Sequence, residues 1–214
     1  MIIPDARSRL TTHDLVLLAR SQGVGDNDLT FAPDLDLVLD QPEIKAFLLA
    51  GEMPGPSASL LFYVLVRHAL VAEGLTDRNL ADYLAALLRD FGVRRRANRI
   101  GDHDDQEHSY MADILTDLAH STGERHFRVS VHLGNYALWL TGIFPDWIEA
   151  RRAGKGGPSL RYYEALGQRG FTEASENRLA ERSGLDAIFQ VTGDRFPTVR
   201  RAVNRVRADI GLAA

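Results

Sequence analysis

Residues 59–73 constrain the fold most, because they are apolar on almost every side when placed on a helix. They read Ser-Leu-Leu-Phe-Tyr-Val-Leu-Val-Arg-His-Ala-Leu-Val-Ala-Glu. A helix that is apolar all round must be covered by other elements on all sides. The stretch therefore predicts a central helix that is surrounded by other helices.

Helical periodicity recurs along the rest of the chain, and no convincing pair of strands appears. We predict an all-α fold, an irregular multi-helix bundle of about nine helices with no significant sheet. The chain of 214 residues is expected to form a single helical domain. Within it, residues 1–52 would be an N-terminal arm or subdomain and residues 57–214 the main bundle, because Pro54-Gly-Pro56 cannot continue a helix. The predicted helices cover residues 12–20, 42–50, 59–73, 76–88, 105–120, 124–144, 159–180, 185–191 and 198–212, with a short turn at 146–152.

The arrangement of four of these helices is also predicted. The aromatic-rich helix of residues 124–144 is expected to be the hub against which the remaining helices pack. Residues 59–73 and 76–88 are expected to form a tight helical hairpin. In the helix of residues 105–120 the expected buried stripe includes Tyr110, Met111 and Leu115. Gly167 and Gly170 lie inside a predicted helix, which indicates close approach of a neighbouring helix.

Two segments are predicted to lack helix. Residues 25–40 are rich in Asp and contain Pro33, which predicts an extended arm lying on the helices. Residues 91–105 pass from strongly basic to strongly acidic without an apolar period, which predicts an exposed loop.

Composition excludes several classes of protein. The chain has no cysteine, so disulfides, thiolate zinc sites and iron–sulfur clusters are ruled out. The formal net charge of −4 predicts no nucleic-acid partner. Residues 129–145 are interrupted by polar residues and fall short of the ~20 apolar residues of a membrane span, so no membrane partner is expected. The N-terminus lacks an export signal, and we predict a cytoplasmic protein with no cofactor.

A ligand pocket is predicted at the aromatic-rich helix of residues 124–144. His132, Asn135 and Tyr136 fall at helical spacings of three and four, so they share one face, which Trp139 extends. A few polar anchors above an apolar floor are typical of a ligand pocket. The alternative is that these are core polar groups whose hydrogen bonds neighbouring residues satisfy. The turn at Pro145 and the glycine connector are expected to bring three further candidates close: Trp147, Tyr162 and Glu164.

Four phrases in this sequence resemble an uncharacterised family of bacterial helical proteins. They begin at Tyr63 (Tyr-Val-Leu-Val-Arg-His-Ala-Leu), Asn79 (Asn-Leu-Ala-Asp-Tyr-Leu-Ala-Ala-Leu-Leu), His132 (His-Leu-Gly-Asn-Tyr, continuing to Gly-Ile-Phe-Pro-Asp) and Tyr162 (Tyr-Tyr-Glu-Ala-Leu-Gly). The similarity spans roughly residues 59–212. The resemblance implies a bacterial cytoplasmic helical protein, and it transfers no catalytic residue because that family has no assigned activity.

A metal site is the strongest chemical alternative. Residues 102–108, Asp-His-Asp-Asp-Gln-Glu-His, are dense in oxygen and imidazole ligands, and Asp113, Asp117 and His120 continue along one helical face. His68 with His103-Asp104 is similar to part of the histidine–aspartate phosphohydrolase layout. No complete metal signature is present, however, and the paired Glu-x-x-His of di-iron bundles is absent. The loop is therefore predicted to be solvated, and no metal ligand is assigned.

Arginines form two further candidate groups. One group is Arg94, Arg95, Arg96 and Arg99, and the other is Arg200, Arg201, Arg205 and Arg207. Both groups would suit phosphate, but a solvated face is favoured because surface arginines are ordinarily exposed to solvent. Arg67 lies on the apolar helix and needs a partner, since burying an unpaired cation costs several kcal/mol. Glu164 or Asp82 is the predicted partner.

Three hypotheses follow for function. The first is a non-enzymatic binding or regulatory protein whose small-molecule or protein partner binds at the predicted pocket. The second is a metal-dependent hydrolase that uses His68, His103, Asp104 and Asp113 or Asp117. The third is a structural partner in a protein assembly. A homodimer formed through one apolar helix face is also predicted. No catalytic residue is assigned.

Overall fold

A computed structural model describes residues 2–24, 34–51, 54–92, 96–100, 107–108 and 110–211 of the chain. Within these ranges the fold is all-α, as predicted, and no strand occurs. The described residues form a short 3₁₀-helix, η1 (Arg7–Arg9), and twelve α-helices, which are more than the nine expected. The helices are α1 (Thr12–Ser21), α2 (Leu35–Leu39), α3 (Pro42–Leu49), α4 (Ala58–Ala72), α5 (Arg78–Phe91), α6 (Met111–His120), α7 (Gly123–Ile143), α8 (Pro145–Lys155), α9 (Leu160–Ser175), α10 (Arg178–Ser183), α11 (Asp186–Asp194) and α12 (Phe196–Asp209).

The additional helices arise at local caps that the apolar pattern does not reveal. The helix predicted over residues 159–180 is divided, because the Asn177 side chain accepts a hydrogen bond from the amide of Leu179 and starts α10. The predicted extended arm contains α2, which Asp34 caps through the amide of Asp36. Residues 25–33 of that arm, and most of the predicted loop at 91–105, lie outside the described residues.

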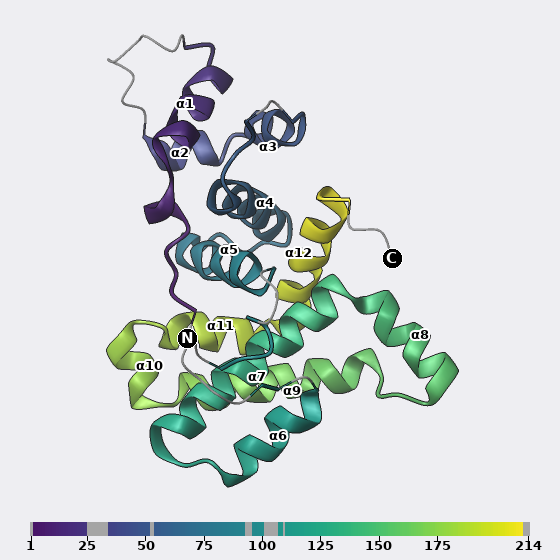
Figure 1. The fold of residues 1–214 in the computed structure, drawn as a ribbon. Helices are drawn as coiled ribbons and strands as arrows, with labels where there is room; N and C mark the ends of the chain where they lie inside the picture. The colour runs from purple at the N-terminus through teal and green to yellow at the C-terminus, as the bar shows by residue number, and fades with distance from the viewer. Residues whose placement is uncertain are drawn as a thin grey trace.

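The aromatic-rich helix α7 lies at the centre of the bundle, which confirms its predicted position. It contacts α9, α12, α6, α5 and α8 (Figure 1). Every residue from 129 to 138 is buried. Five other helices cover α7 along most of its length. The size of its side chains therefore sets the distance to the neighbouring helices.

Glycines allow α7 and α9 to cross in close contact. A Cβ atom on Gly170 of α9 would lie 2.7 Å from the backbone nitrogen of Gly134 and from the carbonyl oxygen of Ser130, both on α7. A Cβ on Gly167 would lie 2.3 Å from the ring of Phe196, which begins α12. Real Cβ atoms do not approach backbone this closely, so larger residues would push these helices apart. The predicted role of Gly167 and Gly170 in close helix contact is confirmed.

The apolar helix α4 pairs with α5 in the predicted tight hairpin and also contacts α12 and α3. Gly74 ends α4 with φ +77°, a left-handed conformation that glycine adopts without strain. The Asp77 side chain then caps α5 by accepting from the amides of Asn79 and Leu80. The hydrophobic core extends from Ile2 to residues of α12, so the N-terminal segment shares one core with the helices that follow.

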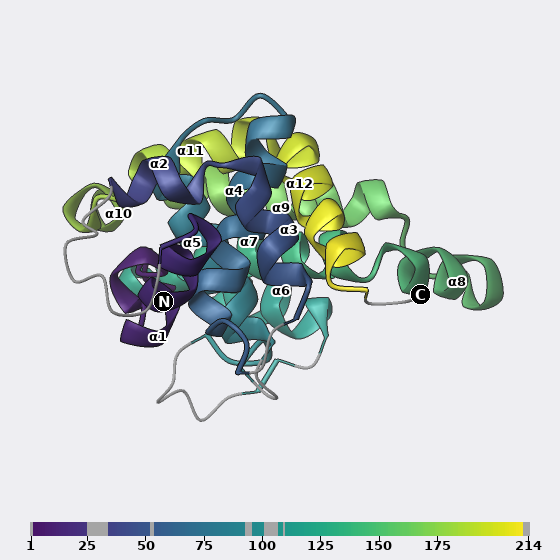
Figure 2. The same cartoon turned by 90° about the horizontal axis from the view of Figure 1, so that it is seen from above.

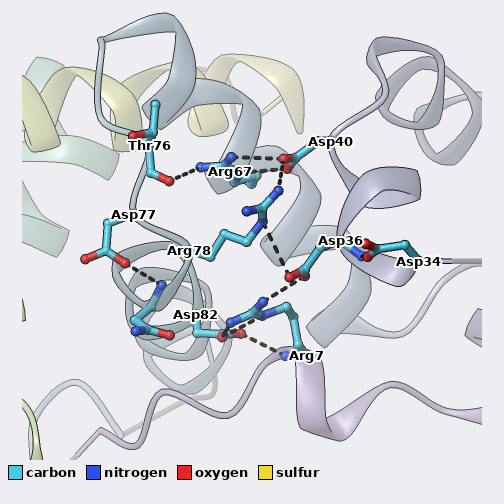
Figure 3. A network of polar contacts seen from close by, with 10 residues as sticks. Arg7, Asp34, Asp36, Asp40, Arg67, Thr76, Asp77, Arg78 and Asp82 are labelled. Atoms are coloured by element: carbon cyan, nitrogen blue, oxygen red, sulfur yellow. Dashed lines mark hydrogen bonds and ion pairs between the residues drawn. The ribbon is translucent and has the colours of Figure 1, made fainter.

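The N-terminal segment is attached to α4 and α5 by a chain of ion pairs (Figure 3). The guanidinium of Arg7 binds Asp36 at 2.7 Å and Asp82 at 2.7 Å. The guanidinium of Arg78 bridges Asp36 at 3.6 Å and Asp40 at 2.5 Å. Alternating cations and carboxylates therefore join η1, α2 and α5.

The predicted partners of Arg67 were wrong. Its guanidinium forms a two-point contact with Asp40, at 2.7 and 3.0 Å, and donates to the carbonyl of Thr76 at 2.7 Å. Asp82 is bound to Arg7 instead, and Glu164 is bound to Arg200 at 2.7 Å. The true partner, Asp40, is the last residue of the segment that is predicted to be an extended arm, and no helical spacing relates it to α4.

Helix α8 extends away from the body of the bundle and returns to it through α9 (Figures 1 and 2). Among the described residues, no helix combines the length and the apolar character that crossing a membrane requires.

Candidate functional site

A groove of about 600 Å³ lies between α6, α7, α8 and the start of α9. Its volume is in the range of pockets for drug-sized ligands. Both tryptophans of the chain line it. The lining residues are Tyr110, Met111, Ala112, Leu115, Tyr136, Trp139, Leu140, Phe144, Trp147, Arg151, Pro158, Tyr162 and Tyr163. We call this space the aromatic groove.

The sequence around Pro145 opens the aromatic groove. Phe144 leaves the helical conformation, with φ −124° and ψ 42°, and Pro145 then occupies the first turn of α8, where its missing N–H costs no hydrogen bond. Ile148 is the one buried residue of α8 and attaches this helix to the bundle. Gly156 ends α8 with φ +65°, after which the chain returns along the groove to α9. Helix α8 therefore stands as one wall of the groove and is held mainly at its start.

Aromatic rings form a continuous wall along the α7 side. The ring of Trp139 lies 5.8 Å from that of Tyr136 and 4.9 Å from that of Phe144, measured between centroids. Both distances are in the range where aromatic pairs attract each other beyond simple burial. The Trp139 ring also meets Phe91 at 5.9 Å, which fixes it from behind. The α7 side is thus rigidly packed.

The rim of the groove is open to solvent. Trp147 is 48 % exposed and Tyr110 is 62 % exposed, while Phe144 and Tyr162 are also exposed. Isolated exposed apolar residues are ordinary, but a contiguous group of aromatic side chains is typical of a binding surface. The rim of the groove therefore carries apolar surface that a bound molecule would cover.

The polar groups in the groove can all donate hydrogen bonds. Among the described lining residues Arg151 is the one charged side chain, and its guanidinium lies 5.2 Å from the centroid of the Trp147 ring. Burial raises the pKa of the Tyr136 and Tyr163 hydroxyls, so both remain protonated at neutral pH. Neither hydroxyl forms a hydrogen bond with the part of the chain that the structure describes.

The structure places the predicted pocket residues in three different environments. Tyr136, Trp139, Trp147 and Tyr162 line the aromatic groove together, as the turn at Pro145 suggested. His132 and Asn135 lie deeper on α7, at 4 % and 2 % exposure, beside a void of only about 10 Å³. Glu164 lies outside both and is bound to Arg200.

His132 and Asn135 fit the structural alternative better than a role in ligand contact. The amide oxygen of Asn135 accepts a hydrogen bond from the Tyr83 hydroxyl at 2.8 Å, with both groups buried. Burial lowers the pKa of His132 to about 3, so its ring is neutral at physiological pH. The Nε2 atom of His132 is buried and has no hydrogen-bond partner among the described residues, and a space of about 10 Å³ is large enough for about one water molecule.

Several groove residues were not among the predicted site residues. Tyr110, Met111 and Leu115 of α6 were predicted as a buried stripe, yet the helix begins only at Met111 and this edge lines the groove. Arg151 and Tyr163 carry most of the polar character, and no spacing rule marks them. The adjacent pair Tyr162-Tyr163 was an available signal, because both rings of a pair that starts a helix cannot be buried on one face.

The predicted metal-binding residues are not assembled into a site in the described chain. The His68 ring contacts the carbonyl of Leu39 at 3.0 Å. Asp113 accepts from the amide of Tyr110, which starts α6, and Asp117 binds both His108 and Arg125. Among described residues no three His, Asp or Glu side chains are placed to hold one metal ion. His103 and Asp104 lie outside the described residues.

The arginines of α12 are engaged in ion pairs. Arg201 and Arg205 both bind Glu73 at 2.9 Å, which joins α12 to the end of α4. Arg200 binds Glu164 and Arg207 binds Asp146. These cations therefore connect helices to one another. In the other arginine group, Arg94 and Arg95 lie outside the described residues, and Arg99 binds Glu107.

Comparison with known proteins identifies no match to a family model, to a curated protein or to a solved structure. The site is therefore interpreted from its own geometry.

Proposed function

We propose that this protein is a non-enzymatic binding protein that takes a largely apolar small molecule into the aromatic groove. The observation that carries the proposal is the groove itself, which is drug-sized, has aromatic walls and includes both tryptophans of the chain. Pockets for small molecules are typically apolar with a few polar groups that orient the ligand, and this composition matches.

The two sides of the groove differ in how firmly they are held. Trp139 is fixed against Tyr136, Phe91 and Phe144, so this wall is preformed and costs little ordering on binding. Trp147 belongs to the projecting helix α8, which contacts α7 and α9. A ligand that fills the groove would cover exposed apolar surface on both sides.

Burial of that surface supplies the affinity. Removing apolar surface from water contributes roughly 25 cal/mol per Å². Covering about 300 Å² of groove and ligand surface would thus contribute about 7 kcal/mol before the cost of association. Because that cost is at least about 4 kcal/mol, this burial supports weak binding, in the millimolar range. A regulatory role would follow if the ligand changes the position of α8.

Intrinsic fluorescence provides a specific test, because Trp139 and Trp147 are the two tryptophans of the chain and both line the groove. We expect a screen of apolar metabolites to identify compounds that change tryptophan emission saturably and raise the melting temperature. Any ligand that binds elsewhere would raise the melting temperature without this spectral change.

A matched pair of variants locates the binding. Ala112 and Ala119 are both exposed on α6, but only Ala112 lines the groove. Ala112→Phe should abolish the fluorescence response, whereas Ala119→Phe should preserve it. Equal fluorescence responses of the two variants would contradict the proposal. A concentration-dependent change in sedimentation that shows the groove is covered by a second copy of the chain would contradict it as well.

A further inference from the structure

The charged and N–H groups of the aromatic groove accept no hydrogen bond, and this restricts the ligand. Among the described residues that line the groove there is no carboxylate. These residues contribute one guanidinium, two indole N–H groups and four phenol hydroxyls. A guanidinium and an indole N–H donate hydrogen bonds and accept none. A ligand group that meets them must therefore be an acceptor.

Arg151 is available for such a group. Its neighbour Arg152 forms an ion pair with Glu149 at 3.5 Å, but Arg151 forms none with the described part of the chain. Instead its guanidinium lies over the Trp147 ring. This contact provides no hydrogen-bond acceptor for the guanidinium N–H groups, and a guanidinium can bind a carboxylate at two points.

The Arg151 side chain is also held in position from behind. The connector folds back on α8, with the amide of Gly157 donating to the carbonyl of Arg151 at 3.5 Å. A Cβ atom on Gly157 would lie 3.3 Å from Cγ of Arg151, so glycine at this position allows the connector to lie against the arginine stem. Contact with the Trp147 ring and with the connector reduces the freedom of a long side chain, and less ordering is then required on binding.

Two buried phenols, Tyr136 and Tyr163, line the groove together with Arg151. Tyr163 is close enough to Arg151 for the cation to counteract part of the burial that raises its pKa, and Tyr163 in turn contributes to the raised pKa of Tyr136. Two protonated hydroxyls and a cation therefore line the same groove.

We propose that the ligand of the aromatic groove is a monocarboxylate with an apolar body, whose carboxylate is bound by Arg151 with help from the Tyr163 hydroxyl. The apolar body lies against Trp139 and the edge of α6. This inference rests on the proposed function, because it identifies the chemical class of the ligand in the same groove. A dicarboxylate or a strongly polar anion would leave a charged group against the aromatic wall, where no partner is present.

The probes are decanoate and decanol, which have the same alkyl chain and differ in the charged group. Binding is followed by tryptophan emission at pH 7. We expect wild-type protein to bind decanoate about tenfold more tightly than decanol, in line with a hydrogen bond to a charged group at a partly exposed site.

Arg151→Met keeps an apolar stem over Trp147 and removes the cation, so it should bring the two affinities within about twofold of each other. Arg152→Met is the matched control, since Arg152 is the adjacent cation, is exposed and does not line the groove. It should retain the preference for decanoate. Tyr163→Phe should reduce that preference without abolishing it.

The outcomes separate the two proposals. If both probes bind equally well to wild-type protein and Ala112→Phe abolishes both, the groove binds ligands and the carboxylate inference is overturned. If the preference for decanoate survives Arg151→Met, the inference is overturned as well. If neither probe nor any other apolar compound changes tryptophan emission, the proposed function itself is overturned.

Discussion

The close crossing of α7 and α9 makes a quantitative prediction about stability. In Gly170→Ala the new methyl group would lie 2.7 Å from the Gly134 nitrogen and the Ser130 carbonyl oxygen, and 3.2 Å from the Gly134 Cα. These atoms belong to the backbone of α7, so no side-chain rotation relieves the contact, and the helices must separate by several tenths of an ångström. Overpacking of this kind costs about 1–3 kcal/mol, and here the upper end is expected.

Gly154→Ala is the control for the intrinsic effect of the substitution. Gly154 lies in α8, and a Cβ there would meet nothing within 4 Å. Alanine in an exposed helix is favoured over glycine by up to about 1 kcal/mol. The free energy of unfolding should therefore rise slightly in Gly154→Ala and fall by about 2–3 kcal/mol in Gly170→Ala.

Urea denaturation followed by circular dichroism at 222 nm measures both variants. The two midpoints should move in opposite directions while the slopes stay equal. If Gly170→Ala is as stable as Gly154→Ala, the two helices do not cross as closely as described, and the reasoning from backbone contact is refuted.

Three further predictions concern buried polar groups. Tyr83→Phe leaves the buried amide oxygen of Asn135 without its donor, and thermal or urea denaturation should show a loss of about 1–3 kcal/mol. Burial lowers the pKa of His132 to about 3, so between pH 6.5 and 3 the unfolded chain binds a proton that the folded chain does not. Stability therefore decreases as the pH is lowered through this window. From pH 7 to pH 5 the free energy of unfolding of the wild-type protein, measured by urea denaturation, should fall by about 2 kcal/mol more than that of His132→Leu. Equal losses would contradict this account. The contact with Arg67 lowers the pKa of Asp40, so Asp40→Asn should reduce the free energy of unfolding by about 3 kcal/mol at pH 7. The difference in stability from wild type should shrink as the pH falls through the lowered pKa. A stability difference that is independent of pH would exclude the ion pair as its cause.

The sequence predicts the all-α class and the central position of α7 for clear physical reasons. Because α7 is buried from Val129 to Leu138, its sequence is mostly apolar there, and this pattern can be recognised without knowing which helices pack against it. Glycines inside helical periodicity mark close contacts, and Gly170 fulfils that role. Helix number is predicted less well, because the break at Asn177 depends on one side-chain cap within a continuous apolar pattern.

The candidate site is predicted in part, and the missing part depends on distance in three dimensions. Spacing along α7 places His132 and Tyr136 on one face, but it does not reveal that Phe91 and Ile100 cover the His132 end. The other end is open because α8 projects away from the bundle. The proposed role of Arg151 depends on the fold of the glycine connector, which a pattern of residue types does not encode.

Ion-pair partners are the least predictable feature. Arg67 was expected to meet Asp82, which lies on the neighbouring helix, yet Asp40 reaches it from the N-terminal segment. Asp82 in turn receives Arg7 from the start of the chain. Such pairs join residues that are distant in sequence, and their choice follows from how the N-terminal segment wraps α4 and α5 (Figure 3).

The central claim is that the aromatic groove is the binding site, and the two indole N–H signals of the chain test it directly. A ¹H–¹⁵N spectrum of the labelled protein should contain one indole signal from Trp139 and one from Trp147. Titration with decanoate should shift both signals along a common saturation curve, and Ala112→Phe should prevent the shift. If backbone signals elsewhere move while both indole signals stay in place, the ligand binds outside the groove and the claim is contradicted.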